Sequence, residues 1–143
     1  MADEKGYSLI VDVAVLANDR TLLLRYKDPE SYDGQGGWFI PDDDIKYLEH
    51  PDDAAKRLVK DQLGLRNLQL VLDHMESFAG NNGTWHLVFH YKITLNAEPV
   101  LQLGENVAVA QWFDLHALPN TDEVAHHGWA LGTLKKIQAN ANR

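Results

Sequence analysis

Residues 37–64 of the chain read GWFIPDDDIKYLEHPDDAAKRLVKDQLG. The segment 37–40 is short and apolar and is predicted to form a strand, which Pro41 breaks into a loop of acidic residues. A helix is predicted to start at Pro51, because proline is tolerated at a first helical position, where the missing N–H has no helical partner. Gly64 is placed to end that helix in the left-handed conformation. A strand, an acidic loop and a helix in this order often build a site for a metal ion and phosphate groups.

The spacing of charged residues in this segment resembles the Nudix box, a motif written G-x5-E-x7-R-E-U-x-E-E-x-G-U, where U is aliphatic. Glu49, Arg57 and Gly64 take the positions of the isolated glutamate, the arginine and the last glycine without a gap. Further matching positions are Trp38, Pro41, Val59 and Leu65.

The segment departs from the box at the positions that carry its chemistry. Asp42 and Asp43 replace the paired glycines before the helix, and Leu58 replaces the glutamate after the arginine. Asp61 and Gln62 stand in place of the two later glutamates. Since left-handed backbone angles cost aspartate more than glycine, we expect the turn before the helix to differ from that of the family.

These departures change the charge on one face of the predicted helix. Positions 58, 61 and 62 share a face, because residues three and four apart are neighbours on a helix. Magnesium prefers hard oxygen ligands, above all carboxylates. Here the face offers one alkyl group, one carboxylate and one amide oxygen, so metal affinity is expected to fall steeply. Leu58 is expected instead to extend the apolar face of the helix.

Length and composition limit the class of protein. The 143 residues predict a single Nudix-like domain over residues 1–143, with flexible tails at 1–6 and 140–143. A net charge of −8 argues against nucleic acid as a partner, and the lack of cysteine excludes disulfides and thiolate chemistry. The first residues are unlike a signal peptide and no apolar run approaches the length of a membrane span. We therefore expect a cytoplasmic protein with no membrane partner.

The remaining segments predict a sheet and a second helix. Strands are expected at 7–16, 21–26, 68–79, 85–95 and 107–115, and the last helix from about Glu123 to Ala139. Trp112-Phe113 and Leu118-Pro119 also resemble Nudix proteins, which often carry such residues before the final helix. The resemblance thus covers most of the chain and implies an α/β Nudix fold, with a mixed β-sheet sandwiched between α-helices.

Two of the expected strands are predicted to pair as a hairpin centred on Asn82. This register sets His74 opposite His90, with Glu76 beside them. Because neutral imidazole suits transition metals, the three side chains are a candidate for metal binding or proton transfer. Polar residues on a half-solvated sheet face are the simpler interpretation. Two further pairs predicted by this register are Met75 with Phe89 and Val71 with Ile93.

The resemblance also implies an activity and its residues. Family members cleave a nucleoside diphosphate linked to another moiety, with a metal-activated water and magnesium to offset the charge of the pyrophosphate. The implied catalytic residues are Glu49, Arg57 and Asp61, with Arg57 orienting an acid on the helix by charge-assisted hydrogen bonds. The implied ligands of Mg2+ or Mn2+ are Asp61, Gln62 and Glu49. The candidate substrate-binding residues are Trp38, Asp43, Arg25 and Glu76.

Two functional interpretations stay open at this point. In the first, the protein has an incomplete catalytic metal site and binds a nucleotide-like small molecule of the nucleoside-diphosphate type with weak or no hydrolysis. In the second, it is an active, atypical pyrophosphohydrolase whose missing metal ligands come from Asp42–Asp44 or Glu105, although three aspartates in a loop are also typical of solvated surface. Leu58 and Gln62 favour the first interpretation, whereas the preserved spacing of the box favours the second. A homodimer is a further expectation, since Nudix relatives often dimerise.

Overall fold

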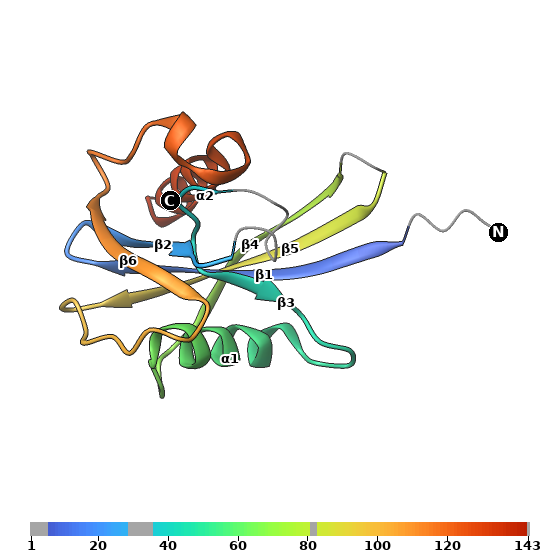
Figure 1. The fold of residues 1–143 in the computed structure, drawn as a ribbon, viewed down its shortest axis with the longest axis horizontal. Helices are drawn as coiled ribbons and strands as arrows, with labels where there is room; N and C mark the ends of the chain where they lie inside the picture. The colour runs from blue at the N-terminus through green and yellow to red at the C-terminus, as the bar shows by residue number, and fades with distance from the viewer. Residues whose placement is uncertain (1–5, 29–35, 81–82, 143) are drawn as a thin grey trace.

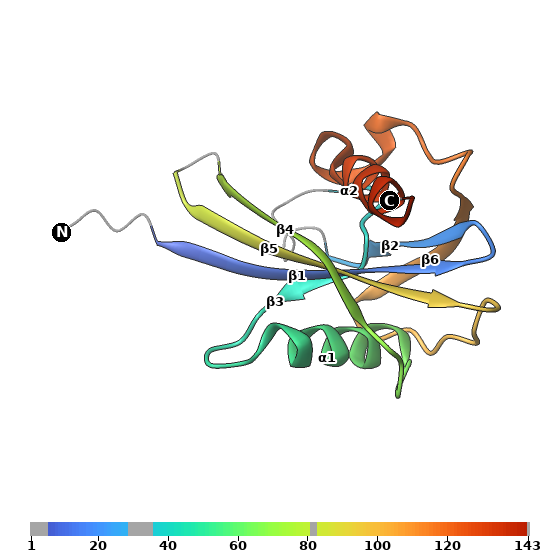
Figure 2. The same cartoon turned by 180° about the vertical axis from the view of Figure 1, so that it is seen from behind.

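The computed structural model describes residues 6–28, 36–80 and 83–142. A mixed sheet lies between two helices, with α1 against one face and α2 against the other (Figure 1, and from behind in Figure 2). This arrangement confirms the expected α/β sandwich. In chain order the elements are β1 (Tyr7–Ala17), β2 (Arg20–Tyr26), β3 (Asp42–Asp44), α1 (Pro51–Leu63), β4 (Val71–Ala79), β5 (Trp85–Leu95), β6 (Val107–Asp114), the 3-10 turn η2 (Thr121–Glu123) and α2 (Ala125–Ala141).

Strand β1 is the centre of the sheet. The strand order is β4-β5-β1-β2-β6, and β3 pairs with β1 off this path. β1 runs parallel to β5 along its whole length, from Tyr7 opposite Trp85 to Ala17 opposite Leu95. A strand that is covered on both faces is expected to be almost continuously apolar. The exception within β1 is Asp12, which is buried with only 4% of its surface exposed.

Alternation along β1 divides the core between the two faces of the sheet. Val13 and Val15 pack in one cluster with Leu58 of α1. Ala14 packs in the other cluster with Leu134 of α2. Each helix therefore packs on its own apolar layer. Alternate side chains of a strand face α1 or α2, so neighbouring residues belong to different layers.

Helix α1 begins and ends as the sequence predicts. Pro51 occupies the first helical position, and the ring nitrogen Nδ1 of His50 accepts a hydrogen bond from the N–H of Asp52 (3.0 Å). Gly64 ends the helix with a φ of 71°, and its N–H donates to the carbonyl of Lys60 (3.0 Å). The left-handed conformation is one that glycine adopts with little strain, so both ends of α1 are set by local sequence.

The acidic segment before α1 differs from the expectation. Asp42–Asp44 was expected to be a loop after a strand at 37–40, but it forms β3 and pairs antiparallel with β1, where Asp43 lies opposite Val11. Within 37–40, Trp38 and Phe39 make only isolated bridges. The pairing with β1 gives the aspartates extended backbone, so replacing the paired glycines of the box imposes no left-handed strain on β3.

The hairpin of β4 and β5 follows the predicted register over most of its length. His74 pairs with His90 and Met75 with Phe89, as expected. Val71, however, pairs with Lys92 instead of Ile93, because a bulge between Leu72 and His74 inserts one residue into β4.

The C-terminal region also departs from the prediction. The helix was expected from Glu123, but a 3-10 turn precedes α2 and the backbone at His126, His127 and Gly128 has positive φ angles of 55°, 57° and 88°. The helix continues to Ala141, two residues into the segment 140–143 that was expected to be a flexible tail, since Asn140 donates a hydrogen bond to Asp73 (2.8 Å). The expected N-terminal tail lies, apart from Gly6, outside the described residues. No helix in the described part of the chain has both the length and the apolar content to cross a membrane.

Candidate functional site

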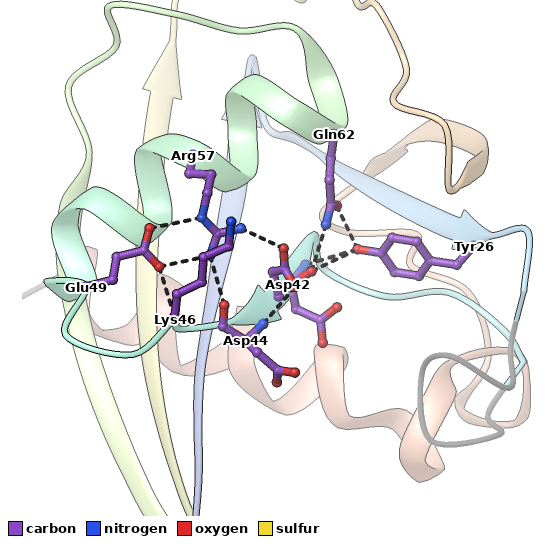
Figure 3. Close-up of polar contacts among 8 residues, drawn as sticks. Tyr26, Asp42, Asp44, Lys46, Glu49, Arg57 and Gln62 are labelled. Carbon is purple, nitrogen blue, oxygen red and sulfur yellow. Dashed lines mark hydrogen bonds and ion pairs between the residues drawn. The ribbon is translucent and has the colours of Figure 1, made fainter.

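Arg57 is the centre of the polar network between β3 and α1 (Figure 3). Its Nε donates to Oε2 of Glu49 (2.9 Å) and its Nη2 donates to Oε1 of the same carboxylate (3.0 Å). Nη1 donates to Oδ2 of Asp43 (2.9 Å), and Nη2 also donates to the carbonyl of Asp44 (2.9 Å). The planar guanidinium thus fixes the loop before α1 and strand β3 against the middle of the helix.

This network keeps the carboxylate of Glu49 ionised. Hydrogen bonds from Arg57, then from the backbone N–H of Lys46, lower the pKa of Glu49 from 4.5 to about 2. The hydrogen bond to Glu49 in turn raises the pKa of Arg57 further above its usual range, although burial opposes this. Both oxygens of Glu49 are engaged, and Arg57 orients Glu49 and Asp43, which precede α1, instead of the expected acid on the helix.

Gln62 belongs to a second, separate network at the other end of β3 (Figure 3). Its Oε1 accepts a hydrogen bond from the hydroxyl of Tyr26 (2.8 Å), and its Nε2 donates to the carbonyl of Asp42 (2.8 Å). Gln62 is itself buried. Its amide therefore joins α1 to β2 and β3, and both ends of that amide have a protein partner.

The two other altered box positions face opposite environments. Leu58 is fully buried and packs in the core between α1 and the sheet, as predicted from the apolar face of the helix. Asp61 is exposed. The backbone of Asp61 lies against Gly104, whose N–H donates to the carbonyl of Gln62 (2.9 Å). This contact brings the exposed Glu105 close to the end of the helix that carries Asp61.

The candidate substrate-binding residues do not gather in one place. The guanidinium carbon of Arg25 lies 4.4 Å from the ring centre of Trp38, a cation–π contact. Trp38 is itself buried in the cluster on the α2 side. Asp43 is bound by Arg57 on the side of α1. Glu76 lies with the histidines of the hairpin.

A polar cluster is buried on the face of the sheet that α2 covers. The ring of His90 is fully buried between two carboxylates, with Nδ1 2.7 Å from Oδ1 of Asp12 and Nε2 2.7 Å from Oε1 of Glu76. Burial alone would lower the pKa of His90, but the hydrogen bond and charge of Asp12, together with Glu76, outweigh it and raise that pKa. Burial also raises the pKa of Asp12, against the opposing effect of His90.

His74 lies beside this cluster with a carboxylate of its own. Its ring stacks on that of His90 with centres 4.4 Å apart, and its Nδ1 is 2.6 Å from Oδ2 of Asp73. Burial would raise the pKa of Asp73, but hydrogen bonds from His74, Asn140 and Lys92 outweigh it and lower that pKa. The pairing of His74 with His90, predicted from the hairpin, therefore places two imidazoles and two buried aspartates in one cluster.

Three residues of these networks were not identified from the sequence. Asp12 was read only as part of an apolar strand, although an acid inside such a run is itself a signal of a buried polar contact. Tyr26 carries no such signal, because its partner Gln62 lies 36 positions away, and the contact of Asp73 with Asn140 spans 67 positions.

Comparisons with known proteins agree with this fold. The sequence matches the family profile described as NUDIX domain over residues 6–131. A MutT NUDIX hydrolase from Burkholderia pseudomallei has a TM-score of 0.70 at 21% identity, covering 94% of this chain and 98% of its own. The MutT protein from Methanosarcina mazei Go1 has a TM-score of 0.75 at 15% identity, with coverage of 99% and 100%. The NUDIX domain of Shewanella oneidensis NrtR, solved in complex with ADP ribose, has a TM-score of 0.69 at 14% identity, with coverage of 94% and 88%.

No curated protein sequence matches the chain. The family profile nevertheless spans all six strands and α1, and the neighbouring structures share the arrangement of the sheet between its helices. These findings agree with the box spacing of Glu49, Arg57 and Gly64. The chain therefore belongs to the Nudix superfamily.

Proposed function

We propose that this Nudix-fold protein binds a ligand of the nucleoside-diphosphate type and hydrolyses it weakly or not at all. The observation that carries the proposal is the burial of Leu58 in the core, at a position where the box has a carboxylate. A side chain that packs between α1 and the sheet supplies neither charge nor an oxygen ligand.

The other candidate ligands fit a magnesium ion poorly. The side-chain oxygen of Gln62 accepts a hydrogen bond from Tyr26, and both oxygens of Glu49 accept hydrogen bonds from Arg57. Asp61 is then the one carboxylate at the altered box positions that is exposed to solvent. Because magnesium requires several oxygen ligands in near-octahedral geometry, these side chains do not form a complete magnesium site.

The nature of the ligand is inferred from the family and from one cleft. A structural neighbour, the NUDIX domain of NrtR, was solved with ADP ribose. In this chain a cleft of about 400 Å3 beside α1 is lined by Lys56, Lys60 and Arg66 among other residues. Without a metal ion, phosphate groups need such cations, and these three supply them on a chain of net charge −8. A second cleft, of about 560 Å3, is lined by Asp44 and Glu49 and suits an anion less well.

The proposal is tested by assaying hydrolysis and binding on the same protein. Purified protein is incubated with magnesium or manganese and a panel of nucleoside diphosphate derivatives that includes ADP-ribose, and phosphate and nucleotide release are measured. We expect no turnover above the rate without protein, and we expect at least one panel member to raise the melting temperature. Lys60→Glu should weaken that stabilisation, whereas Lys135→Glu, which makes the same charge change on the exposed face of α2, should not.

The opposite result supports the alternative function. Metal-dependent turnover that is abolished by Asp61→Ala would establish an active, atypical pyrophosphohydrolase with a rearranged Mg2+ or Mn2+ site. A calorimetric titration of magnesium or manganese into the wild type and Asp61→Ala separates the two proposals independently of substrate. No metal-dependent heat in either protein would support the binding function.

A further inference from the structure

We propose that His74, Glu76 and His90 form a binding site for a transition-metal ion, with Zn2+ as the best-fitting ion. The site lies on the face of the sheet opposite α1 and is independent of the proposed ligand-binding function. One ring nitrogen of each histidine and a carboxylate oxygen of Glu76 lie within 4.8 Å of one another. In the described part of the chain, no other set of three or more histidine, cysteine or acidic side chains meets this condition.

The hairpin brings the three ligand groups together. His74 and His90 are paired residues on β4 and β5, and Glu76 lies two positions along β4, so all three project from the same face. The stacking of the His74 and His90 rings and the short contact between His90 and Glu76 already hold the three groups close together. Zinc binding requires these groups to converge to Zn–N distances near 2.0–2.1 Å.

Each imidazole also has the supporting carboxylate that is typical of metal-bound histidine. Nδ1 of His90 contacts Asp12 at 2.7 Å, and Nδ1 of His74 contacts Asp73 at 2.6 Å. Both aspartate side chains are at most 5% exposed. A hydrogen bond from Nδ1–H to a carboxylate fixes the tautomer and leaves Nε2 as the nitrogen that binds metal. The chain supplies this arrangement twice in one cluster.

The hydrogen bond between His90 and Glu76 can be exchanged for the binding of both atoms to one cation. Nε2 of His90 and Oε1 of Glu76 are 2.7 Å apart, a distance that requires one hydrogen between them. A metal ion that binds both atoms replaces that hydrogen and satisfies both lone pairs.

The charge of the surroundings matches a divalent ion. Three carboxylates, those of Asp12, Asp73 and Glu76, surround the two imidazoles, and one ammonium group, that of Lys92, lies 3.4 Å from Asp73. With neutral imidazoles the cluster carries two negative charges in excess. Two nitrogens and one oxygen favour zinc, nickel or cobalt over magnesium, which prefers oxygen ligands alone.

The site is open on one side. The side chain of His90 is fully buried, whereas that of Glu76 is 39% exposed. A metal ion can therefore enter beside Glu76, and a water molecule can complete a tetrahedral set of ligands there. The bound ion would join β4, which is the edge of the sheet, to β5 and so stabilise that edge.

The test uses the full chain without a polyhistidine tag, freed of metal by a chelator. Zn2+ is titrated by calorimetry, and Co2+ binding is followed by the visible absorption bands of tetrahedral cobalt. We expect one equivalent of each ion to bind and Zn2+ to raise the melting temperature by several degrees. His74→Ala and the nearly isosteric Glu76→Gln should each weaken binding at least tenfold and remove the thermal shift.

The matched control is His127→Ala, which removes an exposed histidine outside the cluster. Its affinity for Zn2+ should stay within twofold of the wild type, and circular dichroism without metal establishes that each variant is folded. The proposal is overturned if the wild type binds no zinc. It is equally overturned if Glu76→Gln binds zinc as tightly as the wild type. Loss of zinc binding in His127→Ala, with binding kept in His74→Ala and Glu76→Gln, would overturn it as well.

Discussion

The two faces of the sheet carry polar networks of opposite design. On the side of α1, one cation, Arg57, organises the carboxylates of Glu49 and Asp43 near the surface. On the side of α2, two carboxylates, those of Asp12 and Glu76, flank the fully buried imidazole of His90. The first network arises from residues at most 14 positions apart, whereas Asp12 and His90 are 78 positions apart.

The two networks differ in the number of chemical states that their central side chain can adopt. A guanidinium is permanently charged, so Arg57 itself has one charge state and serves to hold the box loop. An imidazole accepts a proton or a metal ion, so the cluster of His90 has more than one chemical state. The segment that resembles a catalytic motif thus has the smaller range of chemical states, and the opposite face has the greater one.

The largest expected effect comes from removing His90. We expect His90→Ala to lower the free energy of unfolding by about 3–5 kcal/mol, because breaking a buried ion pair leaves the charge of Asp12 uncompensated. Urea denaturation of the metal-free protein measures this loss. The double variant with Asp12→Ala should lose less than the sum of the two single variants. Strict additivity would show that the two side chains are not coupled.

A smaller effect is expected on the side of α1. Arg57→Lys keeps the positive charge but loses the planar fork that binds Glu49, Asp43 and the carbonyl of Asp44. We expect the free energy of unfolding to fall by about 1–2 kcal/mol, and denaturant unfolding provides the measurement. Arg66→Lys, at an exposed position, serves as the control and should change stability by less than about 0.5 kcal/mol. Equal losses in both variants would argue against a specific role for the fork.

The smallest effect is a dependence on pH. The pKa of Glu49 is about 2 in the folded protein and 4.5 ordinarily, so its ionised form stabilises the fold above pH 4.5, and this stabilisation is lost as pH falls toward 2. We expect the wild type to lose about 1 kcal/mol more than Glu49→Gln over that range, since the pair lies near solvent and is screened.

Thermal melts of both proteins between pH 2 and 6 measure the difference. Asp61→Asn, at an exposed carboxyl that is not part of the network of Arg57, should keep the pH dependence of the wild type. If Glu49→Gln also keeps it, the hydrogen bonds of Arg57 are not its source.

Local features of the fold were predictable from the sequence. Pro51 and Gly64 mark the ends of α1 because their backbone preferences act within one helical turn. The pairing of His74 with His90 followed from the alternation of β5 and the turn near Asn82. The error at Val71 arose from the bulge beside Asp73, whose side chain is held by Asn140 of the last helix. No local pattern in the sequence encodes this bulge or the contact with Asn140.

In the candidate site, too, the spacing of residues close in sequence was easier to predict than the contacts between their side chains. The spacing of Glu49 and Arg57 matched the box, but their direct contact was not predicted, since Arg57 was expected to orient an acid on the helix. The hydrogen bond from Tyr26 to Gln62 depends on how β2 meets α1, and the contact of Asp12 with His90 depends on the parallel pairing of β1 and β5. Such contacts require the topology of the sheet, which a single sequence specifies only through the complete fold.

The parallel pairing of β1 with β5 has a consequence for how the chain folds. It joins segments 78 positions apart, and closing a loop of that length costs about 4 kcal/mol of chain entropy before the first pair contributes any stability. The hairpin of β4 and β5 closes over a few residues and can assemble locally, whereas β1 must wait for β5. We therefore expect this long-range closure, rather than formation of the helices, to set the folding rate. While a nascent chain has emerged only as far as β4, the edge of β1 that pairs with β5 in the folded protein has no partner.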